Sequence, residues 1–112
     1  MAVIATVLIP AKIAENVPTT QYTASNVTTL IDKFTATNFS SAATQITVNL
    51  VTFGGVPGDN NTIVKARTVS PGETYTFPEI VGAAILAGGY ISTLCLAAAS
   101  ITIRASGREI SP

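Results

Sequence analysis

The clearest pattern in the chain is a strict alternation of polar and apolar residues in two segments. Residues 45–50 run Gln-Ile-Thr-Val-Asn-Leu, and residues 100–105 run Ser-Ile-Thr-Ile-Arg-Ala. Alternation with a period of two places every second side chain on the same face of a β-strand. We therefore predict two half-buried strands. The apolar positions that share a buried face are Ile46, Val48 and Leu50 in the first strand and Ile101, Ile103 and Ala105 in the second.

Further segments rich in β-branched residues lie between clusters of Gly, Pro, Asn and Ser, a spacing typical of all-β proteins. Within one of them the apolar phase slips between Ile31 and Phe34, which indicates a bulge or an edge position. Another has apolar residues on both faces, as in a strand covered on both sides. The additional predicted strands are residues 19–24, 27–37, 63–69, 73–77 and 90–97.

The connections between these segments carry recognisable turn chemistry. Residues 70–73, Ser-Pro-Gly-Glu, fit a type II turn, because Pro presets φ at the second position and Gly accepts a positive φ at the third. Residues 54–61 form a long Gly-rich and Asn-rich loop. One short helix is expected over residues 79–87, which follow Pro78 and precede Gly88.

Together these elements predict an all-β fold of about seven or eight strands with at most one short helix. The economical architecture is an antiparallel β-sandwich or jelly roll. A small closed barrel is the alternative. At 112 residues the chain has room for a single domain, which we place over residues 1–112.

The N-terminal residues 3–9 are apolar in both phases and run up to Pro10. One interpretation is a strand buried within its own sandwich, which ends where Pro10 resists further ladder bonding. The other is that residues 1–10 form an arm that adds to the edge of a neighbouring sheet. The residues that the arm would place on a partner are Val3, Ile4, Val7, Leu8 and Ile9.

Composition narrows the classes of function. Hydrophobic residues make up 47% of the chain and charged residues 11%, with six cationic and six acidic side chains and no His or Trp. A neutral chain has no electrostatic attraction for nucleic acid or an anionic membrane surface. The uncharged and largely apolar window at residues 80–99 contains Gly88-Gly89, so we expect a turn there and no membrane span.

The same inventory argues against catalysis and cofactors. Without His the chain lacks the usual general base and the commonest metal ligand. The single Cys95 cannot form an intrachain disulfide, and we expect it to be a buried thiol. We therefore predict a protein that is not an enzyme and carries no cofactor or metal.

Two exposed groups remain as candidates for partner binding. The Gly-rich loop would present Val56, Asp59 and Asn60; its single carboxylate favours an Asn-rich turn over a calcium site. Lys65 and Arg67 lie two positions apart, on the same face of a predicted strand. They would meet carboxylates of an adjoining subunit or, alternatively, form a solvated face.

The order of these elements resembles that of a known group of proteins. In sequence it comprises a short strand with Tyr22, a β-rich segment ending at residues 37–41, the alternating strand at 44–50, the turns at 70–74 and 87–91, and a closing strand at 101–109. With its composition rich in Ala, Thr and Ser, the chain resembles the small β-sandwich accessory proteins of tailed-phage virions, including capsid cement or decoration proteins.

This resemblance implies a structural virion protein on the capsid surface that stabilises the phage head by binding between coat subunits. Its partners would be the major capsid protein and copies of itself, as a dimer or trimer. Two alternatives stay open. One is a neck, tail or fibre component. The other is a carbohydrate-binding module, against which the absence of Trp argues, because sugar sites use aromatic platforms.

Overall fold

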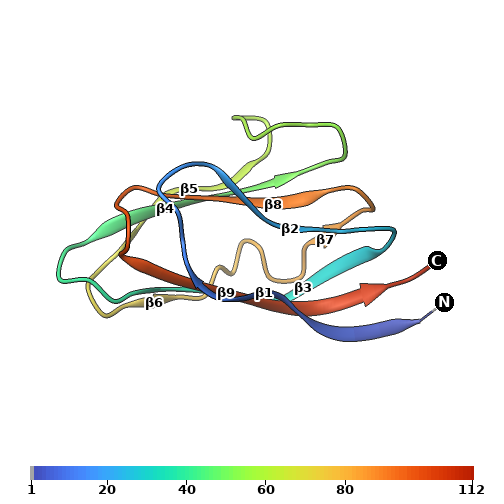
Figure 1. Cartoon of the computed structure of the whole chain (residues 1–112), viewed down its shortest axis with the longest axis horizontal. Coiled ribbons are helices and arrows are strands. Elements are labelled where there is room, and N and C mark those ends of the chain that lie inside the picture. Colours follow the sequence, from blue (N-terminus) through green and yellow to red (C-terminus); the bar gives the residue numbers. More distant parts are fainter. Residues whose placement is uncertain (1) are drawn as a thin grey trace.

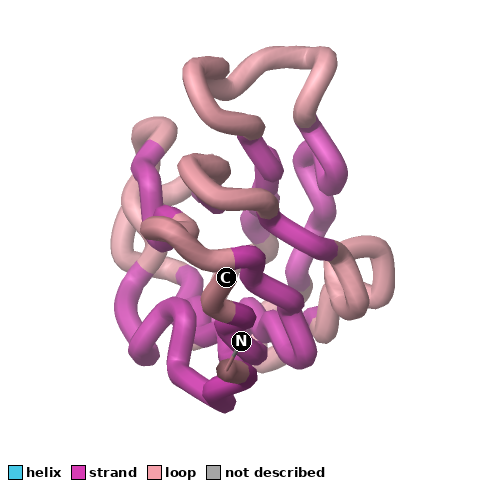
Figure 2. Tube along the Cα trace, turned by 90° about the vertical axis from the view of Figure 1, so that its right-hand side faces the viewer, coloured by secondary structure: helices cyan, strands magenta, loops and turns pink. Residues whose placement is uncertain are grey.

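The computed structural model describes residues 2–112, which fold into two antiparallel β-sheets packed face to face (Figure 1). The view in Figure 2 shows the two layers from one end, with the described termini on the same side. The nine strands of the described residues are β1 Val3–Ile13, β2 Thr19–Thr23, β3 Thr28–Asn38, β4 Thr44–Val51, β5 Thr62–Val69, β6 Thr74–Tyr75, β7 Ala84–Ile85, β8 Tyr90–Cys95 and β9 Ile101–Ile110.

The strand order is that of a jelly roll. One sheet has the order β1-β9-β3-β6, with β7 also beside β3, and the other has the order β2-β8-β4-β5. The first and last strands pair, β2 pairs with β8, and β4 pairs with β5, so the chain is a long antiparallel ribbon rolled into two sheets. The predicted all-β antiparallel sandwich is confirmed. The strand predicted at residues 73–77 is reduced to the two residues of β6, and the unexpected two-residue β7 brings the count in the described residues to nine, above the expected seven or eight.

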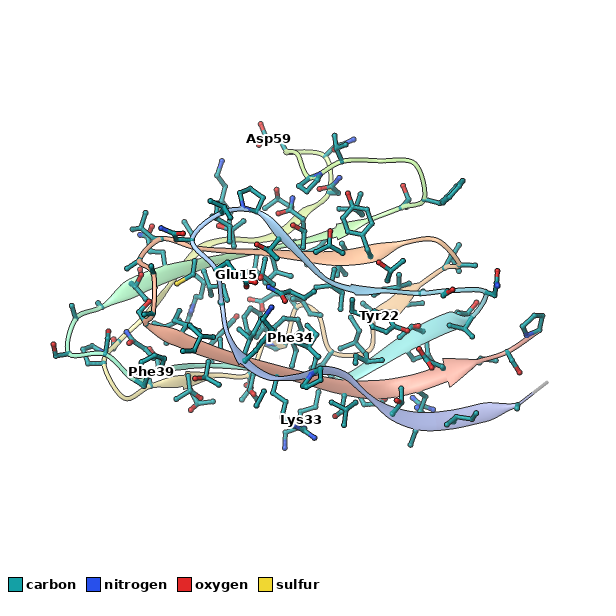
Figure 3. All side chains as sticks on the ribbon, in the orientation of Figure 1. Glu15, Tyr22, Lys33, Phe34, Phe39 and Asp59 are labelled. Carbon is teal, nitrogen blue, oxygen red and sulfur yellow. The ribbon has the colours of Figure 1, made fainter. Side chains whose placement is uncertain are left out.

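The core lies between the sheets and is centred on aromatic rings. Phe34 of β3 and Phe77 are fully buried, with ring centroids 4.6 Å apart, and Tyr75 packs edge-on against Phe77 at 4.7 Å. Figure 3 shows Phe34 between the two layers. Burial of each such side chain contributes roughly 1.5–3 kcal/mol. These rings therefore fix the separation of the sheets at the middle of the sandwich.

The alternating pattern predicted one strand fully and the other in part. In β9 the side chains of Ile101, Ile103 and Ala105 are buried as expected. In β4, Ile46 and Val48 are buried, but Leu50 is only half-buried. The pairing of β4 with β5 shifts between Val48 and Asn49. β4 pairs with β8 without a register shift from Ile46 to Val51, so the extra residue lies in β5 and Leu50 stays on the face of Ile46 and Val48, packed against the edge of the core. Asn49 and Val51 are buried on the opposite face of the strand.

Bulges also appear in β3 and β1. The expected slip in β3 is confirmed by a register shift between Ile31 and Lys33. The expectation that the N-terminal strand stops at Pro10 is wrong, because β1 continues to Ile13. Its pairing with β9 shifts twice, between Val7 and Ile9 and between Ile9 and Lys12. A bulged edge strand accommodates the missing N–H of proline.

The short helix expected over residues 79–87 is wrong, and no helix forms in the described residues. The backbone makes one turn, in which the N–H of Val81 donates to Phe77 O at 3.2 Å, and then leaves it at Gly82, whose φ is 91°. Gly82 N–H donates to Ile31 O at 2.7 Å, and Ile31 N–H donates to Ala83 O at 3.0 Å. Bonds to β3 therefore replace the helical ladder.

The type II turn at residues 70–73 has the expected geometry. Glu73 N–H donates to Ser70 O at 3.0 Å, and Gly72 has a φ of 77°. The predicted burial of Cys95 is also confirmed. The turn depends on four consecutive residues, and the burial of Cys95 depends on the apolar strand that contains it, so both were predictable from the local sequence.

Candidate functional site

The strongest candidate for a binding surface is an apolar patch at one end of the sandwich, where the loop between β4 and β5 projects (Figure 1). We name it the Phe53 patch and define it by Phe53, Val56, Ile63 and Leu86, which are 82%, 74%, 42% and 68% exposed. Phe53 and Leu86 line one groove and Val56 and Ile63 line a second, and the two grooves share Leu50 and Thr52. Clustered exposed apolar side chains mark interaction surfaces in folded proteins. The patch brings together two loops that are distant in sequence.

A buried amide holds the β4–β5 loop in shape. Asn49 is only 7% exposed, and its side-chain amide donates to Asn61 Oδ1 at 2.7 Å and to Gly58 O at 3.1 Å. Asn61 in turn donates from Nδ2 to Val56 O at 2.8 Å and accepts from Gly58 N–H at 3.0 Å. Because these bonds cross the loop, Val56 is displayed on an ordered backbone.

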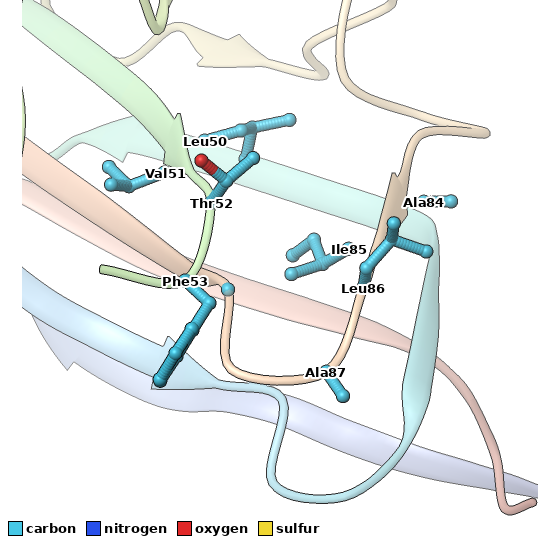
Figure 4. Close-up of a pocket in the computed structure, with 9 residues that line it drawn as sticks. Leu50, Val51, Thr52, Phe53, Ala84, Ile85, Leu86 and Ala87 are labelled. Carbon is cyan, nitrogen blue, oxygen red and sulfur yellow. The ribbon is translucent and has the colours of Figure 1, made fainter. Parts of the chain in front are cut away.

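Phe53 forms one wall of a groove of about 420 Å³ (Figure 4). Leu86 and Ile85, from the segment around β7, lie on the opposite side. The ring of Phe53 rests against Gly88, where a Cβ atom would come within 2.5 Å of Phe53 Cδ1. Gly88 has a φ of 86°, so glycine is required there both by the backbone and by the ring.

The loop residues singled out from the sequence lie at or near this patch. Val56 belongs to it, whereas Asp59 and Asn60 are exposed at the outer tip of the loop (Figure 3). The Oδ1 atom of Asn61 already accepts two hydrogen bonds from the protein. Within residues 2–112, no group of three or more Cys, Asp or Glu side chains is arranged to hold a metal ion.

Lys65 and Arg67 do not form one feature. Between them Ala66 adopts a φ of 50°, and β5 gains a residue relative to β4, so the expectation that Lys65 and Arg67 share one face of a regular strand is wrong. Lys65 is exposed. The guanidinium of Arg67 lies 4.3 Å from the centre of the Tyr75 ring, a cation–π contact that commits it to its own chain.

The N-terminal candidates divide into two groups. Leu8 and Ile9 are 4% and 0% exposed and belong to the core of this chain. Val3, Ile4 and Val7 are exposed, although their backbone pairs with β9 of the same chain. The segment is therefore an edge strand in which only Leu8 and Ile9 are core, whereas most of the residues on either side of them face solvent.

A polar clasp joins the two sheets near the same end as the Phe53 patch. Tyr22 of β2 donates from its hydroxyl to Glu109 of β9 at 2.5 Å, and the same hydroxyl lies 2.6 Å from Thr29 of β3. Burial, and then the hydrogen bond to Glu109, raise the pKa of Tyr22 to about 12. The clasp therefore stays neutral at the phenol throughout the physiological range.

Two further polar contacts stabilise the surface around the core. Tyr75 donates its hydroxyl to the Glu79 carboxylate at 2.5 Å, and this bond lowers the pKa of Glu79. Asp32 accepts two guanidinium hydrogen bonds from Arg108, with a shortest distance of 2.9 Å. The polar groups of these contacts are therefore paired within the chain. The Phe53 patch is the main exposed apolar feature at its end of the molecule.

Sequence reasoning missed Phe53 and Leu86. Phe53 follows β4 directly and precedes Gly54-Gly55, so no strand face is available to bury it. An aromatic side chain inside a Gly-rich loop is the signal that would have indicated it. Leu86 was assigned to a short helix, and only its true position after β7 shows that it is exposed.

The arrangement as a whole is suited to contact between surfaces: ordered loops, apolar side chains at their tips and a shallow groove. The structure contains no helix in residues 2–112 that could span a bilayer. Comparison with protein families, curated proteins and solved structures found no match to this chain.

Proposed function

We propose that this protein is a structural component of a tailed-phage virion, a cement or decoration protein that binds between coat subunits on the capsid surface and reinforces the head. The observation that carries the proposal is the Phe53 patch, an exposed apolar surface on two ordered loops. The jelly-roll strand order supports it by analogy, since this architecture recurs in viral capsid domains. The element order described from the sequence supports it in the same direction.

The proposed mechanism is burial of the Phe53 patch against the coat lattice. Phe53 and Leu86 are both more than two-thirds exposed in the free chain. Transfer of such side chains from water to an interface contributes roughly 1.5–3 kcal/mol each before the cost of association. An ordered loop lowers that cost, because less conformational freedom is lost on binding.

The repeating lattice strengthens a contact that is modest for one copy. A specific interface buries about 1,600 Å² in total, which a chain of this size reaches most readily when it is shared between two neighbouring coat subunits. A molecule that bridges two subunits converts the second contact into an intramolecular one. Reinforcement of the shell then follows from linkage of neighbours.

The first test is the number of copies in purified virions whose genome encodes this chain. Quantitative mass spectrometry against the coat protein gives the ratio. Hundreds of copies per particle support the capsid position. A dozen copies or fewer would replace the proposal with a neck, tail or fibre role, and absence from the particle would overturn a virion role.

The second test compares two exposed phenylalanines at opposite ends of the sandwich. Phe53→Ser removes the largest side chain of the patch, and Phe39→Ser, at a residue 52% exposed beyond β3, is the matched control. In a rebinding assay on particles stripped of this protein, we expect Phe53→Ser to weaken binding at least about tenfold, equivalent to 1.4 kcal/mol. Equal binding by both variants would show that the patch is not the contact.

A further inference from the structure

The outer edge of β1 has a protected half and an unprotected half. From Leu8 to Ile13 the strand carries two bulges and Pro10, devices that prevent another strand from pairing with an edge. From Val3 to Val7 the pairing with β9 is regular, and the segment contains no charge, proline or glycine. Residues 3–7 are therefore an open edge with none of the usual protection.

The hydrogen-bond pattern shows which backbone groups face outward. Ser111 N–H donates to Ala2 O at 2.9 Å, so Ala2 is a hydrogen-bonded position of the ladder. Bonded and non-bonded positions alternate along an antiparallel pair. Residues 4 and 6 therefore bond to β9, whereas Val3, Ala5 and Val7 direct their N–H and C=O groups toward the open edge.

The side chains of this segment are matched to a second copy of itself. Val3 and Val7 are 54% and 46% exposed and lie symmetrically on either side of the small, exposed Ala5. In an antiparallel pairing centred on Ala5, Val3 lies opposite Val7 of the partner subunit. The free backbone groups then face each other at three positions, and each pair exchanges two hydrogen bonds.

We propose that two copies of this chain pair through residues 3–7 of β1, antiparallel and around a two-fold axis at Ala5. The pairing makes one continuous sheet across both copies. It is isologous, as expected for a closed dimer. Other centres of symmetry leave some of the outward groups of Val3, Ala5 and Val7 unpaired, so the register follows from the pattern of the edge itself.

The contact covers one short strand and falls below the roughly 1,000 Å² of a stable interface. We therefore expect a weak dimer in solution, with a dissociation constant on the order of 10–1,000 μM. This inference deepens the proposed function by defining the contact between copies. It is tested on purified chain without particles, so a monomer in solution would overturn the dimer and leave capsid binding to its own test.

The first experiment is a cross-link at the symmetry axis. Paired hydrogen-bonded positions have Cα atoms about 5.5 Å apart, within the range of a disulfide. With oxidised glutathione, Ala5→Cys should form a covalent dimer at least about tenfold faster than Ala11→Cys, an exposed position on the bulged half of the same strand. The native Cys95 is buried and does not compete. Equal rates for the two variants would overturn the proposal.

The second experiment uses charge at the same position. Ala5 lies across from Arg108 in the chain's own ladder, and Arg108 is already paired with Asp32, so Ala5→Glu places a carboxylate beside an existing ion pair and urea unfolding checks that the monomer stays folded. In the dimer the two Glu side chains would lie directly opposite each other, which is destabilising. Sedimentation equilibrium should show the dissociation constant raised at least about tenfold for Ala5→Glu relative to the uncharged Ala5→Gln. A wild-type chain that stays monomeric near 1 mM, or identical behaviour of the two variants, would overturn the proposal.

Discussion

Each end of the sandwich has a buried asparagine that ties a connection to the strands, but the two ends differ in what that asparagine supports. At one end Asn38 is fully buried and donates to Ala42 O at 2.8 Å and to Val69 O at 2.9 Å. At the other end Asn49 is 7% exposed and organises the β4–β5 loop.

The difference lies in where the hydrogen bonds lead. The Asn38 amide donates to Val69 O of β5, in the other sheet, and to Ala42 O in the five-residue turn between β3 and β4. The Asn38 backbone also makes two hydrogen bonds, with residues 72 and 73. The Asn49 amide bonds the β4–β5 loop and Thr62, the first residue of β5; this loop is ten residues long and carries Phe53 and Val56 outward. A buried asparagine therefore joins strands of the sandwich at one end, and at the other end it orders a loop that exposes apolar side chains.

The largest effect is expected from Asn38→Ala. Removal of this amide takes one donor each from the Val69 and Ala42 carbonyls and one acceptor from the Ser40 N–H, and an unsatisfied buried group costs about 1–3 kcal/mol. With the loosened turn, we expect the free energy of unfolding to fall by about 2–4 kcal/mol, measured by urea unfolding. Binding of the folded protein to particles should not change. Loss of particle binding with unchanged stability would contradict the assignment of the binding surface to the Asn49 end of the sandwich.

Asn49→Ala should lower the free energy of unfolding by about 2 kcal/mol, because Asn49 is also buried but its partners can reach water. Its main effect should be local. Hydrogen exchange of the amides in residues 54–60 should accelerate, and rebinding to particles should weaken. A loop that stays protected in this variant would mean that Asn61 alone maintains its shape.

Two glycines with positive φ separate backbone strain from contact with a ring. Gly72→Ala, at a φ of 77° with nothing within 4 Å of the new Cβ, should cost about 1 kcal/mol from the backbone alone. Gly88→Ala has a similar backbone but meets the ring of Phe53 at 2.5 Å. We expect a cost of about 1–2 kcal/mol, a changed chemical shift of the Phe53 ring and weaker binding. Identical behaviour of the two variants would contradict the contact between the Phe53 ring and Gly88.

A smaller effect is expected at alkaline pH, where the Tyr22 clasp opens. The folded chain raises the pKa of Tyr22 from 10.0 to about 12, so folding favours the neutral phenol. The contribution of this pKa shift to the free energy of unfolding is complete below pH 10 and is lost as the pH rises from 10 to 12. With allowance for the partial exposure of the ring, the loss should be about 1 kcal/mol in urea unfolding. In Tyr22→Phe the change over the same pH range should be smaller, and an equal change would assign it to other groups.

Features set by neighbouring residues were predictable. The alternation in β9 placed Ile101, Ile103 and Ala105 correctly, because one face of a strand must meet the core wherever the strand lies. The turn at residues 70–73 and the bulge after Ile31 followed from residue chemistry in the same way. The loop around Val56 was identified as a contact surface candidate because Gly and Asn interrupt the strand pattern there.

Features set by distant residues were not predictable. The segment at residues 79–87 has the composition of a short helix, but the backbone of β3 takes the bonds that a helix would use. Arg67 pairs with the Tyr75 ring because a bulge at Ala66 turns β5. Phe53 and Leu86 become one surface only when two loops meet over Gly88.

The sequence by itself determined an all-β sandwich, its turns and a chain without histidine, because period, turn propensity and composition act locally. Only the tertiary structure decided that Leu8 and Ile9 of β1 are core while residues 3–7 form an open edge, and which end of the sandwich displays the Phe53 patch. The physical reason is that burial and free hydrogen-bonding groups depend on which strand lies alongside, and the partner of β1 is β9, at the opposite end of the chain.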